Sequence, residues 1–128
     1  MTHLNVFVYG SLKKGYSNSN LLNDQEYLGE FKTLDKYSMV SLGTFPGVFL
    51  NGGSSQIQGE LYEVSQACMD SLDQLEGYPN FYDRVLVQIE NSQGDIYVAW
   101  IYYLPSEMDY LDFKPIPSGN WEEQLYWS

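Results

Sequence analysis

One histidine and one cysteine among 128 residues limit the covalent chemistry open to this chain. Ser-His-Asp or Cys-His catalysis would have to use His3 or Cys68. His3 stands at the start of the chain, and Cys68 falls on the apolar side of a predicted helix, where a free thiol usually packs as a small hydrophobic group. The same shortage argues against a zinc site, which normally takes several His or Cys ligands. We therefore expect no metal and no cofactor.

The carboxylate in the most informative context is Glu76, in the segment LDQLEGYPNFYDR. It stands in the last turn of a predicted helix, where the helix dipole disfavours negative charge. A carboxylate buried there would have a raised pKa and could act as a base near neutral pH. The residues alone leave a second interpretation open, in which Glu76 is solvated and Gly77 caps the helix.

A second informative feature is the end of an apolar run near the N-terminus, in NVFVYGSLKKG. The run stops at Gly10, and the successive N–H groups of Gly10, Ser11 and Leu12 can bind a carboxylate or a developing oxyanion without a charged side chain. The glycine spacing and the Lys-Ser/Thr pair of a P-loop are missing. The pattern also fits an ordinary strand end, followed by Lys13 and Lys14 as solvated or pocket-rim residues.

These residues must be positioned by a strand-rich fold. The patterns predict strands over 4–9 and 56–62, two short strands around a turn at 34–35, and a hairpin formed by YDRVLVQIEN and GDIYVAWIYYL. Single helical turns are expected around 20–22 and after Ser118 or Asn120. The clearest helix begins at Ser65 and ends at Gly77, with four residues at helical spacing: Cys68, Met69, Leu72 and Leu75.

Length and composition indicate a single domain over residues 1–128, because 44% hydrophobic residues are enough for one core. Six basic and 17 acidic residues give a net charge of -11, which argues against nucleic acid and anionic membrane surfaces as partners. No apolar stretch is long enough to cross a membrane, and the first residues lack the pattern of a secretory signal. With a single cysteine, these features predict a cytoplasmic protein.

Three segments together, VFVYGSL, LDQLEGYPNFYDR and IPSGNW, resemble the γ-glutamylcyclotransferase-like family, which includes γ-glutamylamine cyclotransferases and AIG2-like and BtrG-like proteins. The resemblance extends from Asn5 to about Trp121. It implies an α+β fold with a small, mixed, strongly curved β-barrel and flanking helices. It also implies a metal-independent enzyme that cleaves a γ-glutamyl amine or γ-glutamyl amino acid. The substrate's α-amino group attacks its γ-carbonyl, so 5-oxoproline and a free amine are released.

The resemblance also implies roles for particular residues. Glu76 would be catalytic, and the substrate-binding residues would be Tyr9, Gly10, Ser11, Leu12 and Tyr82. Arg84 is expected to pair with an acid, and Trp121 to pack the C-terminal segment onto the barrel. The leaving amine would be recognised by the loops over 16–24 and 102–112.

Two other classes of function remain open at this stage. A non-catalytic protein could use the same pocket to hold a small ligand. A structural or interaction domain would instead expose an apolar patch and would not depend on Glu76. A carboxylate beside the N–H groups favours the enzyme, because a protein that only binds has no need for it. The residues do not separate γ-glutamyl amines from γ-glutamyl amino acids, and they leave the oligomeric state open.

Overall fold

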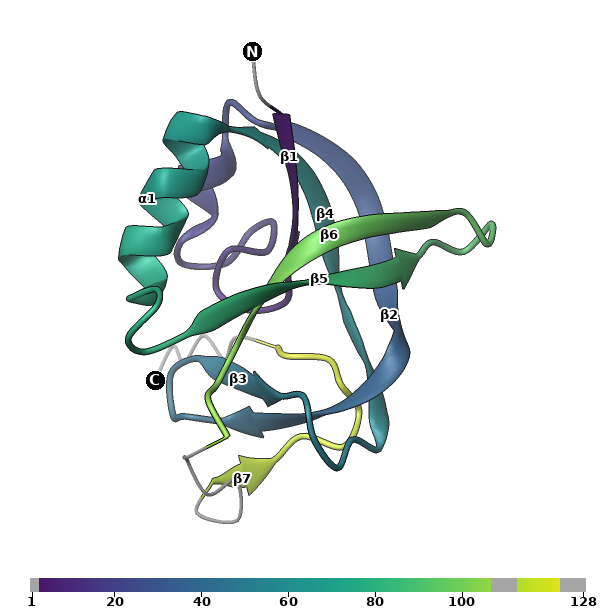
Figure 1. Cartoon of the computed structure of the whole chain (residues 1–128). Coiled ribbons are helices and arrows are strands. Elements are labelled where there is room, and N and C mark those ends of the chain that lie inside the picture. Colours follow the sequence, from purple (N-terminus) through teal and green to yellow (C-terminus); the bar gives the residue numbers. More distant parts are fainter. Residues whose placement is uncertain (1–2, 107–112, 123–128) are drawn as a thin grey trace, which may run out of the picture.

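A computed structural model describes residues 3–106 and 113–122. In chain order the elements are β1 (His3–Val8), the 3-10 helix η1 (Ser19–Leu22), β2 (Glu26–Ser41), β3 (Pro46–Phe49), β4 (Ser55–Ser65), α1 (Gln66–Glu76), β5 (Asp83–Glu90), β6 (Ile96–Tyr103) and β7 (Lys114–Pro115). The strands curve into a barrel, α1 lies against one side of it, and β3 and β7 lie at one end (Figure 1).

Five strands close the barrel in the order β2-β4-β1-β6-β5, and β5 pairs with β2 to complete the ring. The pairings are antiparallel except that of β1 with β6, which run parallel where Val6 lies opposite Trp100. β3 and β7 pair with the C-terminal part of β2, outside the ring. The predicted mixed, strongly curved β-barrel is thus confirmed. Besides the barrel, the described residues contain one α-helix and one 3-10 helix.

β1 divides the core into two parts because its side chains alternate between the two faces of the sheet. Phe7 and Tyr9 point into the barrel, together with residues such as Ile57 and Ile101. Val6 and Val8 belong to the layer under α1, and all of these side chains are buried. Since β1 is covered on both faces, the loop that follows it starts from a fixed position.

β2 corrects one expectation, because it is a single strand of 16 residues and not two short strands around a turn at 34–35. Its pairing with β4 shifts register between Lys32 and Lys36. The fully buried Thr33 bridges this irregularity: its hydroxyl accepts the N–H of Ile57 at 2.9 Å and donates to the carbonyl of Asp35 at 2.7 Å. These bonds satisfy the backbone where the strand bends and where it meets β5.

The helix follows its sequence pattern closely, whereas the short strands β3 and β7 were not predicted. The Ser65 hydroxyl caps α1 by accepting the N–H of Cys68, and Gly77 ends the helix in a left-handed conformation with φ 67°. Cys68 packs in the core beside Met69 and Leu72, as predicted. Leu75 does not, since it is 44% exposed. No helical turn is found between Ser118 and residue 122, and residues 123–128 lie outside the described residues.

Candidate active site

A cavity of about 310 Å³ opens where the end of β1, the end of α1 and the start of β3 meet. All six residues singled out from the sequence line it: Tyr9, Gly10, Ser11, Leu12, Glu76 and Tyr82. The volume is at the small end of the range of about 300–1,000 Å³ that is usual for small-molecule sites. The cavity therefore suits a small molecule better than a polymer.

The loop after β1 lines this cavity and contains unpaired amides. The chain turns at Gly10, whose carbonyl accepts the N–H of Lys13 at 3.0 Å. Among the described residues, the N–H groups of Gly10, Ser11 and Leu12 have no hydrogen-bond acceptor. The carbonyl and the hydroxyl of Ser11 both accept from Asn18, which fixes the loop. A group of free amides held in this way can bind an anionic oxygen.

Gly10 is required here by the close approach of β3. A Cβ atom at this position would lie 2.9 Å from Cδ and 3.0 Å from Cγ of Pro46. Pro46 is fixed in turn, because its carbonyl accepts the hydroxyl of Tyr82 at 2.6 Å. A side chain at position 10 would thus push the amide loop and β3 apart.

Lys13 ties the same loop to the C-terminal segment. Its ammonium donates to the carbonyl of Trp121 at 2.6 Å and to the side-chain oxygen of Asn120 at 3.2 Å. Burial lowers the pKa of Lys13, although nearby carboxylates such as Glu60 oppose this effect. Lys13 is therefore neither solvated nor on the rim of the cavity, whereas Lys14 is exposed and lies over the ring of Tyr27.

Glu76 is the group in the cavity that can change its charge near neutral pH. Its side chain is partly buried, and among the described residues its carboxylate has neither a hydrogen-bond donor nor an ion-pair partner. Burial raises the pKa of Glu76 to about 7. The group is accordingly held in both protonation states at neutral pH, as proton transfer in both directions requires.

The three tyrosines of the cavity are committed to other partners. The Tyr9 hydroxyl donates to the carbonyl of Tyr102 at 2.8 Å, Tyr82 donates to Pro46, and the Tyr102 hydroxyl donates to Asp73 at 2.7 Å. Burial is the main cause that raises the pKa of each of them, and the charge of Glu76 adds to it. They stay protonated at neutral pH, whereas Glu76 can exchange a proton there.

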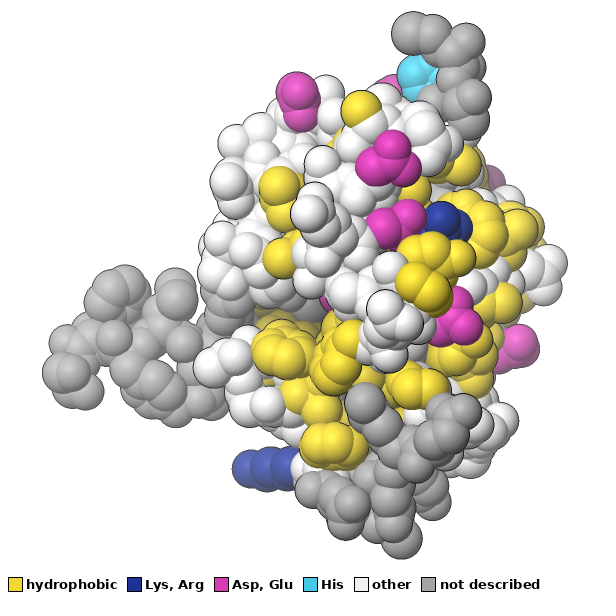
Figure 2. Space-filling view, turned by 60° about the vertical axis from the view of Figure 1, so that its left-hand side comes forward, with side chains coloured by type: hydrophobic (Ala, Val, Ile, Leu, Met, Phe, Trp, Pro, Cys, Tyr) yellow, Lys and Arg dark blue, Asp and Glu magenta, His cyan; other side chains and the backbone are white. Residues whose placement is uncertain are grey.

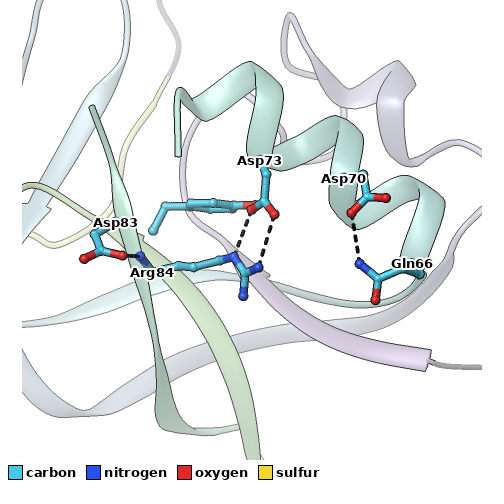
Figure 3. Close-up of polar contacts among 6 residues, drawn as sticks. Gln66, Asp70, Asp73, Asp83 and Arg84 are labelled. Carbon is cyan, nitrogen blue, oxygen red and sulfur yellow. Dashed lines mark hydrogen bonds and ion pairs between the residues drawn. The ribbon is translucent and has the colours of Figure 1, made fainter. Parts of the chain in front are cut away.

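Arg84, on β5, holds the end of α1 against the barrel by binding Asp73, which lies one turn before Glu76. Its Nε and Nη2 atoms donate to the two oxygens of Asp73 at 2.9 and 3.1 Å (Figure 3). The guanidinium also lies 4.4 Å from the ring centroids of both Tyr78 and Trp100. The expected pairing of Arg84 with an acid is thus confirmed. Trp121, also as expected, packs against the barrel core.

Several cavity residues were not predicted from the sequence. Ser17, Asn18 and Tyr102 fall within the ranges 16–24 and 102–112, which were expected to recognise the leaving amine. Tyr102 is in β6 and not in a loop, and residues 107–112 lie outside the described residues. Thr44, Phe45, Pro46 and Phe81 were missed. The FPG segment at 45–47 carried one signal in the sequence, a rigid Pro-Gly break directly after an aromatic residue.

The described residues contain neither a metal-binding cluster nor a helix that could span a membrane. Among residues 3–106 and 113–122, no three His, Cys, Asp or Glu side chains come together in a way that could hold a metal ion. In the same part of the chain, none of the helices is long and apolar enough to cross a membrane.

Known proteins are similar to this chain along most of its length. A model of the family described as "Gamma-glutamyl cyclotransferase, AIG2-like" matches residues 6–123. The γ-glutamylcyclotransferase family protein YtfP of Escherichia coli (strain K12) is 34% identical over 118 residues, covering 92% of this chain and 96% of that protein. The γ-glutamylaminecyclotransferase A of Danio rerio is 37% identical over 109 residues, covering 77% of this chain and 68% of that protein.

A solved structure has the same fold. The crystal structure of an AIG2-like protein from Mus musculus superimposes with a TM-score of 0.79 at 24% sequence identity, covering 92% of this chain and 88% of the mouse chain.

Proposed function

The chain belongs to the γ-glutamyl cyclotransferase, AIG2-like family, and we propose that it is an enzyme that cleaves γ-glutamyl amides by cyclising them. The observation that carries this proposal is a carboxylate with a pKa of about 7, on the wall of a cavity that free backbone amides also line. The name of the zebrafish relative refers to γ-glutamylamines, which supports the same substrate class.

Glu76 serves as base and then as acid in the proposed reaction. The substrate's α-ammonium releases a proton to Glu76, and the neutral α-nitrogen attacks the γ-carbonyl carbon to form a five-membered ring. The second proton of the attacking nitrogen also leaves, while the bond from the γ-carbon to the leaving nitrogen breaks. The leaving nitrogen gains both protons and departs as an ammonium ion, so no water is consumed and 5-oxoproline remains.

The amides of Gly10, Ser11 and Leu12 would bind the anionic oxygens. One is the oxygen of the γ-carbonyl, which becomes negative during the attack, and another is the substrate's α-carboxylate. Removing one donor from such an oxyanion site typically costs about 3–4 kcal/mol of transition-state stabilisation. The nucleophile is part of the substrate, so holding a folded conformer can lower the barrier by about 7 kcal/mol or more. No nucleophilic side chain is required.

The pH dependence of the reaction tests the role of Glu76. Because the base must be ionised, kcat/KM should fall about tenfold per pH unit below a pKa near 7 and should level off above it. The measurement is 5-oxoproline release from a γ-glutamyl amide between about pH 5 and pH 9. A rate that stays constant from pH 5 to pH 8 would assign the base to a different group.

Gly10→Ala tests the position of the amide loop. Since the added Cβ would collide with the ring of Pro46, the loop must move, and we expect KM to rise by about tenfold or more. The double variant Gly10→Ala, Pro46→Ala removes the colliding Cγ and Cδ atoms and should recover most of the loss, with Pro46→Ala alone as the control. Equal activity of Gly10→Ala and the wild type would mean that the loop does not bind substrate.

An assay for the proposed function follows directly. Purified protein is incubated with γ-glutamyl amides and γ-glutamyl amino acids, and 5-oxoproline is measured. If none reacts while γ-glutamyl compounds still bind, the protein is a non-catalytic binder of the same ligands and the proposal fails.

A further inference from the structure

The mouth of the cavity differs in character from its floor. The floor is formed by buried residues, of which Tyr9, Leu12 and Tyr82 are at most 6% exposed. Three apolar side chains line the cavity at its outer edge: Phe45 (37% exposed), Phe81 (38%) and Leu75 (44%). We call these three residues the apolar collar. Apolar side chains gather in the lower half of Figure 2, which looks onto the side of the molecule that carries α1.

The collar comes from three separate segments and is fixed by ring packing. Phe45 lies between β2 and β3, Leu75 is in the last turn of α1, and Phe81 lies between α1 and β5. The rings of Phe45 and Phe81 meet edge to face, with centroids 6.4 Å apart, and Phe81 also packs on Tyr82 at 4.9 Å. Exposed aromatic groups held in this way at a cavity mouth are suited to cover an apolar group of a ligand.

No cation lies in the cavity. All six Lys and Arg residues of the chain fall within the described residues, and none of them lines it: Lys13, Lys14, Lys32, Lys36, Arg84 and Lys114. The segments outside the described residues near the C-terminus read EMDYLD and EQLYWS, so they contain no basic residue either. Within this chain, nothing can neutralise a second carboxylate at the cavity mouth.

The proposed reaction decides which part of the substrate meets the collar. In that reaction the free amides and Glu76 would hold the γ-glutamyl group, so the leaving amine would point to the open side of the cavity, which the collar lines. A leaving amino acid would bring its α-carboxylate there, close to the Glu76 carboxylate and in a protein of net charge -11. Such a group would lose water without gaining a cation, which is unfavourable. A leaving group with a second ammonium would be desolvated against apolar side chains.

On these grounds we propose that the collar of Phe45, Leu75 and Phe81 selects γ-glutamyl amides whose leaving amine is uncharged beyond its reacting nitrogen, apolar, and preferably aromatic. The inference rests on the proposed function and adds to it the substrate class and the residues that determine it.

The proposal has two parts, that the leaving amine carries no further charge and that an aromatic group is preferred. Four substrates separate them: the γ-glutamyl amides of 2-phenylethylamine, phenylalanine, ethylamine and alanine. The first two differ only by a carboxylate, as do the last two, and the phenyl group distinguishes the pairs. We expect kcat/KM to be at least about tenfold higher without the carboxylate, and at least about tenfold higher with the phenyl group. If kcat/KM is equal or higher with the carboxylate, the part on charge is overturned, and if it is equal or higher without the phenyl group, the part on the aromatic group is overturned. Faster cleavage of γ-glutamylputrescine than of the phenylethylamide also overturns the part on charge.

Leu75→Lys tests the collar itself. Leu75 is exposed in the last turn of α1, where a lysine also suits the helix dipole, so the fold should tolerate it. We compare kcat/KM for γ-glutamylphenylalanine with kcat/KM for the γ-glutamyl amide of 2-phenylethylamine. The variant should increase the ratio of the first to the second at least about fivefold. Because both substrates use Glu76, a changed pKa of the base cancels in this ratio. The control is Leu86→Lys on β5. Leu86 is 51% exposed, somewhat more than Leu75, and does not line the cavity, so the ratio should equal that of the wild type.

Binding to the Glu76→Gln variant separates failure of this inference from failure of the proposed function. Calorimetry with the phenylethylamide and the phenylalanine compound needs no turnover. Tighter binding of the phenylethylamide by about tenfold or more supports the collar even if no 5-oxoproline forms, whereas equal affinities overturn the inference even if the enzyme is active.

Discussion

We expect Glu76→Gln to lower kcat for 5-oxoproline formation by about 10³-fold. This loss lies within the range of about 10²–10⁴ that general acid–base groups contribute. Glutamine has nearly the same size, so the cavity and the amide loop should be unchanged and the affinity for γ-glutamyl ligands should remain close to that of the wild type. The measurement is single-turnover release of 5-oxoproline, which separates the chemical step from binding.

The same variant should gain stability at alkaline pH. The folded state raises the pKa of Glu76 from 4.5 to about 7, so it binds a proton more tightly than the unfolded chain does. Stability that is present below about pH 4.5 is therefore lost as the pH rises through 7, by on the order of 3 kcal/mol. Glu76→Gln removes this loss, and it should be more stable than the wild type at about pH 8 but not at pH 4.

Urea unfolding at both pH values measures this difference. Glu26→Gln is the matched control, because it removes the same charge from an exposed position on β2. If Glu76→Gln is less stable than the wild type at about pH 8, the Glu76 carboxylate stabilises the fold, and burial does not raise its pKa.

Arg84→Met should have the largest effect on stability, a loss of about 3 kcal/mol or more. The side chains of Arg84 and Asp73 are only 16% and 17% exposed, and the variant would leave the Asp73 carboxylate with the Tyr102 hydroxyl as its remaining partner. Removing one member of a buried, doubly hydrogen-bonded pair typically costs about 3–5 kcal/mol. Arg84→Lys should recover part of this loss, since it keeps the charge but not the fork or the packing between Tyr78 and Trp100.

Asp70 provides the control on the same helix. Its carboxylate accepts the side-chain amide of Gln66 at 2.9 Å on the exposed side of α1 (Figure 3). Asp70→Asn should change the free energy of unfolding by less than about 0.5 kcal/mol. If Arg84→Met and Asp70→Asn have equal effects in urea unfolding at about pH 7, the pair of Arg84 with Asp73 does not hold α1 to the barrel.

The parts of the structure that depend on neighbouring residues could be predicted from the sequence. Ser65 and Gly77 mark the two ends of α1 by local hydrogen bonds and a left-handed backbone, so the position of Glu76 followed from the pattern. The turn at Gly10 could be recognised in the same way. The resemblance to a family then placed both features in one site, which local patterns could not do.

The parts that depend on distant residues could not be predicted. β2 continues through Leu34 and Asp35 because Thr33 is bonded to Ile57 on another strand, which no local pattern reveals. Burial of Lys13 depends on acceptors more than 100 residues further along the chain. Phe45 and Phe81 lie in loops, where single aromatic residues carry no periodic signal, and only the closed barrel brings them together.

The apolar collar also bears on how this fold could acquire new substrates. None of its three residues takes part in strand pairing, and each belongs to a different connection or helix end. The end of α1 that carries Glu76 and the amide loop are instead held by hydrogen bonds that do not involve the collar side chains. We therefore expect substitutions at positions 45, 75 and 81 to change the mouth of the cavity without breaking these hydrogen bonds. In evolutionary terms, we expect the proposed substrate range and the proposed catalysis to be able to change independently on this barrel.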